Sequence, residues 1–158
     1  MAGISLHGAN LAVINSRIAD NVGGIHMWGS AVHLKSGVTI ENNSHVGVNA
    51  TLGSRIHIES NTTIRRNNYF GIWLGDTSVV GGNSQGGILI TENLGTGVFC
   101  DAAPAVAHIA PDYGSGVRFS INESHVFGNF GSYQINCPGI VVPTPSSIAV
   151  PTPSSIVK

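Results

Sequence analysis

Short segments in which apolar and polar residues alternate run along most of this chain. In residues 32–34 and 56–58 an aliphatic side chain stands on either side of a histidine, so each segment has one apolar face. Alternation with a period of two predicts strands with one buried face. Ala12 and Ile14 are interpreted as the apolar face of an earlier strand of the same kind, with Val13 on the other face. The 21 glycines and the frequent Val, Ile and Thr disfavour helices, so an all-β chain is predicted.

These segments recur at a nearly constant period. Residues 29–43 (GSAVHLKSGVTIENN) align without a gap with residues 53–67 (GSRIHIESNTTIRRN), which gives a repeat of 24 residues. An Ile or Val three positions before an asparagine marks every unit, with spacings of 22, 24, 26 and 36 residues between units. The longest spacing predicts an insertion at about 102–116. The marked pairs are Ile18/Asn21, Ile40/Asn43, Ile64/Asn67, Ile90/Asn93 and Val126/Asn129.

Each unit contains three short strands, and the natural neighbour of each strand is its own copy in the next unit. Such a chain must coil, with parallel pairing between successive turns. The pattern resembles the right-handed parallel β-helix of the pectin-lyase-like superfamily, in which one repeat forms one turn, or rung, of the coil. The resemblance covers about residues 3–137 and implies an all-β solenoid of about five to six rungs. It also implies an asparagine ladder, in which stacked side-chain amides hydrogen-bond along the coil at a tight turn that the asparagine backbone tolerates; its members are Asn21, Asn43, Asn67, Asn93 and Asn129.

The composition changes after residue 139, so residues 1–139 are assigned to the repeat domain and residues 140–158 to a linker or tail. In the tail VVPTPSSIA is followed by VPTPSSIVK, and proline cannot donate a hydrogen bond to a central strand. A linker predicts further chain beyond Lys158. Unpaired strand edges at the two ends of a short coil also predict association, as a homo-oligomer or by stacking through the open rung ends.

Charged residues are few and balanced. There are 7 Lys and Arg against 8 Asp and Glu, which gives a net charge of -1 and excludes a binder of nucleic acid that depends on a basic surface. No run approaches the roughly 18 to 20 apolar residues that a membrane-spanning helix needs, so no transmembrane segment is predicted. The resemblance implies a secreted or cell-surface protein, whose signal peptide is absent from this sequence.

One outward face of the predicted coil collects aromatic side chains. Exposed aromatic rings present an apolar surface to a sugar ring, so one interpretation is a surface that binds polysaccharide. The other interpretation is an aromatic ladder that only stabilises neighbouring strands. Trp28 and Tyr69 lie near the adjoining turns and could extend the face. The residues placed at equivalent outward positions are His26, Asn49, Trp73 and Phe99.

A second outward face stacks His33 over His57. Two imidazoles could hold a metal, but a zinc ion needs a third and usually a fourth ligand, and the sequence indicates none. No metal site and no cofactor are therefore predicted. Exposed ion pairs between neighbouring strands are predicted for Lys35 with Glu59 and for Glu41 with Arg65.

Enzymes of the pectin-lyase-like group provide a test for catalysis. Polygalacturonases of that group carry NTD, DD, GHG and RIK motifs, and none of these occurs in the sequence. A calcium-dependent lyase needs clustered aspartates and an arginine base, for which Asp76, Asp101 and Arg118 are the weak candidates. Both aspartates are more simply interpreted as turn residues that cap backbone N–H groups.

We therefore favour a non-catalytic domain that serves as a structural scaffold or as a carbohydrate-binding surface. The alternative is a polysaccharide-active enzyme, either a calcium-dependent lyase or a glycoside hydrolase, or a fragment of one. Ca²⁺ would be bound only if the protein were a lyase.

The two cysteines, Cys100 and Cys137, lie near the ends of equivalent strands about one rung apart. A disulfide between them closes a loop of 37 residues and is favoured over two buried thiols. The alignment sets residues 98–100 beside residues 133–135, which leaves the two cysteines offset by two positions.

Overall fold

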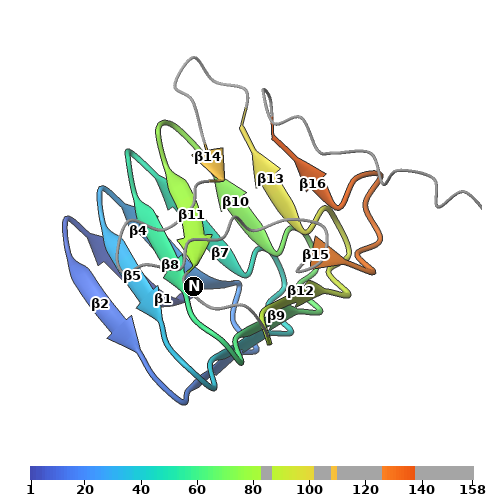
Figure 1. Cartoon of the computed structure of the whole chain (residues 1–158), viewed down its shortest axis with the longest axis horizontal. Coiled ribbons are helices and arrows are strands. Elements are labelled where there is room, and N and C mark those ends of the chain that lie inside the picture. The colour runs from blue at the N-terminus through green and yellow to red at the C-terminus, as the bar shows by residue number, and fades with distance from the viewer. Residues whose placement is uncertain (83–86, 102–107, 110–125, 138–158) are drawn as a thin grey trace, which may run out of the picture.

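The computed structural model describes residues 1–82, 87–101, 108–109 and 126–137, and within these ranges every regular element is a β-strand. The chain coils through three sheets, and each strand pairs in parallel with its copy in the next rung (Figure 1). Sheet A contains β1 (Ala2–His7), β4 (Gly23–Trp28), β7 (Val48–Thr51), β10 (Ile72–Leu74), β13 (Val98–Cys100) and β16 (Ile135–Asn136). Sheet B contains β2 (Asn10–Val13), β5 (Ala31–Leu34), β8 (Arg55–Ile58), β11 (Val79–Gly82) and β14 (His108–Ile109). Sheet C contains β3 (Arg17–Ala19), β6 (Thr39–Glu41), β9 (Thr63–Arg65), β12 (Leu89–Thr91) and β15 (Val126–Phe127).

The predicted all-β solenoid is thus confirmed, with six, five and five strands in the three sheets. In the described part of the chain no helix is present that could cross a membrane. The predicted insertion and the predicted tail at 140–158 fall outside the described residues, apart from the short strand β14.

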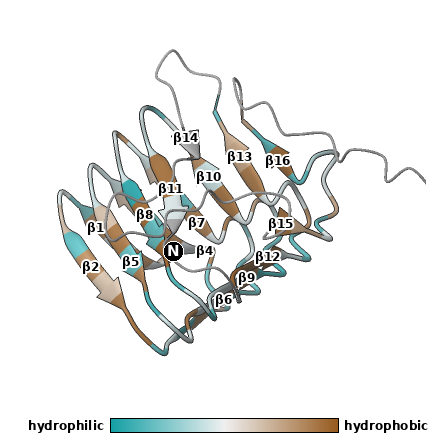
Figure 2. Cartoon of the chain, in the orientation of Figure 1, coloured by the Kyte–Doolittle hydropathy of each residue, from teal (hydrophilic) through white to brown (hydrophobic). Residues whose placement is uncertain are grey.

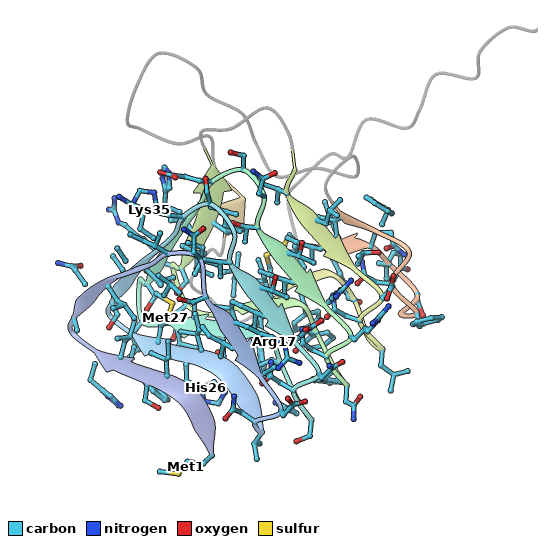
Figure 3. The ribbon with its side chains drawn as sticks, turned by 90° about the horizontal axis from the view of Figure 1, so that it is seen from below. Met1, Arg17, His26, Met27 and Lys35 are labelled. Carbon is cyan, nitrogen blue, oxygen red and sulfur yellow. A yellow bond between two sulfur atoms is a disulfide. The ribbon has the colours of Figure 1, made fainter. Side chains whose placement is uncertain are left out.

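The core is a single column of aliphatic side chains enclosed by the three sheets. Inward and outward residues alternate along strands such as β5 and β8. Figure 2 shows hydrophobic and hydrophilic bands following one another along the ribbon. Met27 points between the sheets and is 1% exposed, whereas His26 and Lys35 project from different sides of the coil (Figure 3). The marker residues of the repeat occupy one interior position in successive rungs, since each is at most 8% exposed: Ile18, Ile40, Ile64, Ile90 and Val126.

The predicted register is wrong in the first strand of sheet B. Leu11 pairs with Val32 and Val13 with Leu34, so Val13 is buried while Ala12 and Ile14 face outward. Residues 11–14 are all apolar, so alternation alone does not identify the inner face. Burial of the strand against the core decides it instead.

The predicted register is also wrong in the last rung. Val98 pairs with Ile135, not with Tyr133, which is 62% exposed. Ile135 lies six positions after Asn129, whereas the equivalent residues of sheet A lie four or five positions after their ladder asparagines, so the strand is shifted by two residues from the predicted Tyr133. The shift removes the offset between the cysteines, and Cys100 is bonded to Cys137 with their Cα atoms 4.6 Å apart.

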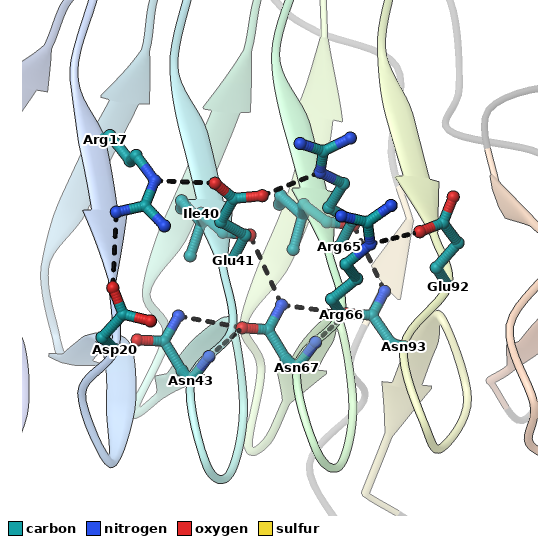
Figure 4. A network of polar contacts seen from close by, with 11 residues as sticks. Arg17, Asp20, Ile40, Glu41, Asn43, Arg65, Arg66, Asn67, Glu92 and Asn93 are labelled. Carbon is teal, nitrogen blue, oxygen red and sulfur yellow. Dashed lines mark hydrogen bonds and ion pairs between the residues drawn. The ribbon is translucent and has the colours of Figure 1, made fainter.

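The asparagine ladder runs along the turn between sheets C and A. In each step one Oδ1 accepts from both the backbone N–H and the Nδ2 of the asparagine one rung earlier. The Nδ2 to Oδ1 distances are 2.9 Å from Asn43 to Asn67 and 2.8 Å from Asn67 to Asn93 (Figure 4). The distance from Asn93 to Asn129 is also 2.8 Å. These four side chains are buried, so the bonds satisfy amides that have no access to water.

The ladder ends differently at its two sides. Asn21 joins only through its backbone N–H, 3.1 Å from the Oδ1 of Asn43, because its own Nδ2 donates to the carbonyl of Ala19. At the other side Gln134 receives both donors of Asn129 on its Oε1, each at 2.9 Å, and donates back to the Asn129 carbonyl at 3.0 Å. Gln134 therefore takes the place of a further ladder asparagine from within the same turn.

The ladder asparagine was expected to adopt the left-handed backbone conformation in this turn. The residue immediately before it adopts that conformation instead. These residues have φ between 53° and 63°, and four of the five are not glycine: Asp20, Asn42, Arg66, Glu92 and Gly128. The ladder bonds hold the turn although a left-handed conformation costs an L-residue about 1 to 2 kcal/mol.

A second polar ladder, made of serines, was not anticipated. The backbone N–H of Ser30 donates to the Oγ of Ser54 at 3.1 Å, and that of Ser54 donates to the Oγ of Ser78 at 3.0 Å. The Oγ of Ser30 accepts from the N–H of Ala9 in the same way. The sequence signal was present, since the three serines are spaced by 24 residues.

Candidate functional site

The outer face of sheet A carries the column of side chains that the sequence predicts. His26 pairs with Asn49, Asn49 with Trp73, and Trp73 with Phe99 on successive parallel strands. Each side chain stands between two buried neighbours on its own strand, and each is partly exposed. The sheet therefore holds these four residues, called the sheet A column below, at the spacing of adjacent strands.

The two large aromatic rings of the column do not form a flat platform. Trp73 and Phe99 meet edge to face, with centroids 6.3 Å apart and planes at 71°. Phe70, which is 8% exposed, stacks on Phe99 at 4.5 Å and 10°. This geometry is the preferred packing of aromatic pairs, so part of their surface stabilises the rungs themselves.

Two further rings extend the aromatic surface over the turn that leads into sheet A. Tyr69 is 43% exposed and stacks against His45 of the preceding rung, with centroids 5.0 Å apart. His45 also lies 6.5 Å from Trp73. His45 and Phe70 were missed by the sequence analysis, although His45 and Tyr69 stand at the same position after a ladder asparagine.

Three polar atoms of the sheet A column are buried and have no hydrogen-bond partner among the described residues: Nε2 of His26, Oδ1 of Asn49 and Nε1 of Trp73. Gly23 leaves the space that the His26 ring occupies. The pKa of His26 is lowered, chiefly by burial and then by His45 and the chain N-terminus, so the imidazole is neutral at neutral pH. The column thus combines apolar rings with an unpaired donor and an unpaired acceptor, and it contains no formal charge.

Trp28 belongs to another column of the same sheet. Its ring stacks on His7 at 4.3 Å and 13°, and it meets His26 edge to face at 5.9 Å. Trp28 therefore covers the strands β1 and β4 and touches the sheet A column only at its edge.

The two candidate catalytic aspartates do not occupy paired positions on neighbouring rungs. The N–H of Asp101 donates to the Leu74 carbonyl, which sets Asp101 beside Gly75 and one position away from Asp76. The Oδ2 of Asp76 accepts from the N–H of Leu52 at 3.1 Å, so this side chain caps a turn. Arg118 lies outside the described residues.

Sheet C carries a chain of charged side chains on its outer face (Figure 4). Glu41 accepts from Arg17 Nε at 2.7 Å and from Arg65 Nε at 2.8 Å. The predicted pair with Arg65 is present, but Glu41 is only 7% exposed, so the expectation of an exposed pair is wrong for this carboxylate. Hydrogen bonds from Arg17 and Arg65 hold the pKa of Glu41 below its ordinary value. A separate exposed pair joins Arg66 to Glu92.

The outer face of sheet B carries the two stacked histidines. His33 pairs with His57 on the next strand, and their ring centroids are 4.0 Å apart. Glu59 contacts His33, 2.8 Å from Oε1 to Nε2, rather than the predicted partner Lys35, and this contact is an ion pair only when His33 is protonated. The pKa of His33 is lowered, first by burial and then by His57, while Glu59 acts in the opposite direction.

Comparison with known proteins identifies one family. A family model for right-handed β-helix regions matches residues 1–101, which is more than half of the chain. No curated protein and no solved structure matches the chain.

Proposed function

The chain belongs to the right-handed β-helix family, and from this premise we propose that it is a non-catalytic domain of a secreted or cell-surface protein that binds a polysaccharide on sheet A. The observation that carries the proposal is the sheet A column, which presents partly exposed aromatic rings on a face without formal charge, with unpaired polar atoms buried beneath it. Parallel strands keep this surface rigid, which lowers the entropic cost of binding.

A hydroxyl-rich ligand suits this surface for two reasons. The rings of Trp73 and Tyr69 offer apolar area to the C–H face of a sugar. The Asn49 Oδ1 accepts and the Trp73 Nε1 donates, and both atoms lack partners that a sugar hydroxyl supplies once the side chains shift to reach it. A polysaccharide that runs along the coil axis would meet one rung after another.

The absence of charge in the sheet A column supports a neutral glycan over a uronate. His26 is the only titratable group in the column, and its lowered pKa keeps it neutral. A pectin-like uronate would place a carboxylate in every sugar ring against this surface without a cationic partner. We therefore propose a neutral polysaccharide as the ligand class.

Two observations support the non-catalytic part of the proposal. Asp76 is engaged as a turn cap, and Asp101 is one position out of register with it, which disfavours a shared cation or a paired acid and base. The motifs of the pectin-lyase-like polygalacturonases are absent from the sequence. The bond between Cys100 and Cys137 supports export, because disulfides persist in oxidising compartments.

The test is affinity gel electrophoresis of the full chain in neutral and uronate polysaccharides, combined with calorimetry on soluble oligosaccharides of the retarding glycan. Trp73→Ala is expected to weaken binding by roughly tenfold and Phe99→Ala by less, because truncation of a central aromatic residue commonly costs more than 1 kcal/mol. Phe130→Ala is the matched control, since Phe130 is 73% exposed and lies outside the sheet A column. Trp73→Phe, which keeps a ring, should retain part of the affinity.

The outcomes separate the alternatives. Binding that survives Trp73→Ala unchanged in a folded variant, judged by circular dichroism, would reject sheet A as the binding surface. Retardation only in uronates would reject the neutral ligand. Depolymerisation of any substrate, with or without Ca²⁺, would reject the non-catalytic assignment.

A further inference from the structure

The second candidate site lies on the outer face of sheet B, away from the sheet A column. His33 on β5 and His57 on β8 stand side by side in neighbouring parallel strands, with ring planes at 77°. Glu59 follows His57 by two residues, and strand alternation therefore points its side chain to the same face. Its carboxylate lies 2.8 Å from the Nε2 of His33.

These three side chains bring a set of metal-ligating atoms together. One donor atom from each of His33, His57 and Glu59 lies within 4.8 Å of the other two. Among the described residues this is the one such group of at least three His, Cys, Asp or Glu side chains. Imidazole nitrogen and carboxylate oxygen are the usual ligands of zinc, and the pair of histidines disfavours Ca²⁺ and Mg²⁺, which prefer oxygen.

The neighbouring rungs leave room around this group. The residue beside His33 on the preceding strand is Ala12, and the residue beside His57 on the following strand is Gly81. Small residues at both positions add no bulky side chain to the column on either side of the two rings. The side chains of His33 and Glu59 are 35% and 25% exposed, whereas the Nε2 atoms of both histidines are buried, so the rings must rotate to present these atoms to an ion.

We propose that His33, His57 and Glu59 bind a divalent transition-metal ion of the zinc type, with the fourth coordination position open to water or to an external ligand. This inference goes beyond the proposed function and does not depend on it, because the two sites lie on different sheets.

The geometry suits a tetrahedral ion after small side-chain rotations. Zinc at about 2.1 Å from each ligand separates the ligand atoms by about 3.4 Å. The present group brackets that value, since the pair of His33 and Glu59 is 2.8 Å apart and all its members lie within 4.8 Å. The ion would replace the direct contact between Glu59 and His33 and would keep both groups bonded to a common centre. The strands that carry the ligands are paired on both sides, which fixes the backbone of the site.

The charges around the site set its strength. Glu59 supplies one negative charge, while Lys35 occupies the equivalent position one rung earlier and Arg55 lies two residues before His57 on the same face. Both cations oppose a divalent ion, so a surface site of moderate affinity is expected.

The test uses the full chain without a polyhistidine tag. Zn²⁺ binding is measured by calorimetry, and Co²⁺ is added as a spectroscopic probe whose visible absorption reports a tetrahedral site. The expected result is one ion per chain and a tetrahedral Co²⁺ spectrum that Zn²⁺ abolishes. Each of His33→Ala, His57→Ala and Glu59→Gln should weaken Zn²⁺ binding by at least about tenfold. His7→Ala removes a histidine from sheet A and should leave the affinity within about twofold.

Three outcomes would overturn the proposal. They are no saturable Zn²⁺ binding, an affinity that Glu59→Gln leaves unchanged, and an octahedral Co²⁺ spectrum. Because Glu59→Gln preserves shape at a partly exposed position, it keeps the test valid even if a histidine variant fails to fold. Trp73→Ala should not change Zn²⁺ affinity, so failure of the polysaccharide proposal and failure of the metal proposal are distinguishable.

Discussion

Truncation of Asn67 to alanine is expected to destabilise the coil by about 4 kcal/mol, because it removes the middle of the asparagine ladder. The Oδ1 of Asn67 accepts from the backbone N–H and from the Nδ2 of Asn43, at 3.2 Å and 2.9 Å. Both donors are buried and lose their acceptor in the variant. A buried donor left unpaired costs about 1 to 3 kcal/mol, so the two together cost about 2 to 6 kcal/mol. The backbone N–H of residue 67 still donates to Asn93, which limits the damage on the other side.

Asn21→Ala is the matched control at the edge of the same ladder. The Asn21 side chain makes one ladder-region hydrogen bond, from its Nδ2 to the Ala19 carbonyl, and the residue is only partly buried. Its truncation orphans no buried amide, so the expected loss is about 1 kcal/mol or less.

Equilibrium unfolding in urea measures both variants, followed in parallel by far-ultraviolet circular dichroism and tryptophan fluorescence. Coincident transitions justify a single free energy of unfolding, which is not automatic in a stack of repeats. If Asn67→Ala lost less than about 1 kcal/mol, or no more than Asn21→Ala, the reasoning that buried ladder amides depend on one another would be refuted.

Glu41→Gln is expected to lower the free energy of unfolding by about 1 to 3 kcal/mol at neutral pH. The pKa of Glu41 is held below its ordinary value of 4.5. The stability that the Glu41 carboxylate contributes is therefore complete above pH 4.5 and is lost as the pH falls through the lowered pKa. A loss of stability in Glu41→Gln that persists unchanged in strong acid would contradict this. Gly71→Ala should lower the free energy of unfolding by about 3 kcal/mol, because a Cβ there would lie 2.6 Å from a carbonyl oxygen of the next rung. Gly8→Ala has no neighbour within 4 Å and should cost only the strain of its positive φ, about 1 kcal/mol. Equal losses of unfolding free energy in urea would argue against the clash. Reduction of the bond between Cys100 and Cys137, which closes a loop of 37 residues, should lower stability by about 3 to 4 kcal/mol and should have no effect on the double serine variant.

The repeat itself was predictable because its marker residues face the core in every rung. Ile40 and Ile64 are completely buried, and the asparagine three positions after each of them hydrogen-bonds to its copy in the next rung. These two positions therefore need an apolar residue and an asparagine in every rung, which makes the repeat visible in the sequence. Register within a single rung was less predictable. Residues 11–14 are uniformly apolar, so their pattern does not identify the buried face. In the last turn Gln134 stands where the other rungs have a glycine before the strand, so the start of that strand is not marked. The predicted register was therefore wrong in both strands.

In the two candidate sites, the columns of stacked side chains were likewise predictable, whereas the contacts between individual side chains were not. Strand pairing sets His33 over His57 and aligns the sheet A column, and both follow from the period of the sequence. Which neighbour Glu59 contacts depends on side-chain rotation, and nothing in the sequence favours the diagonal His33 over the directly opposite Lys35. The third ligand of the candidate metal site was therefore missed. The angle between Trp73 and Phe99 is likewise decided by packing against Phe70, which no alignment of columns contains.

The direction of the asparagine ladder has a consequence for synthesis on the ribosome. The Nδ2 groups of Asn43, Asn67 and Asn93 each donate to the asparagine of the following rung, so each of the three leaves the ribosome before that acceptor. Because domains begin to fold from the N-terminus while translation continues, the growing coil always carries one rung whose buried donors await an acceptor not yet made. Gln134 ends this dependence, since it lies in the same turn as Asn129 and returns a hydrogen bond to it. Once Gln134 has left the ribosome, the buried donors of Asn129 have an acceptor and the ladder needs no further rung.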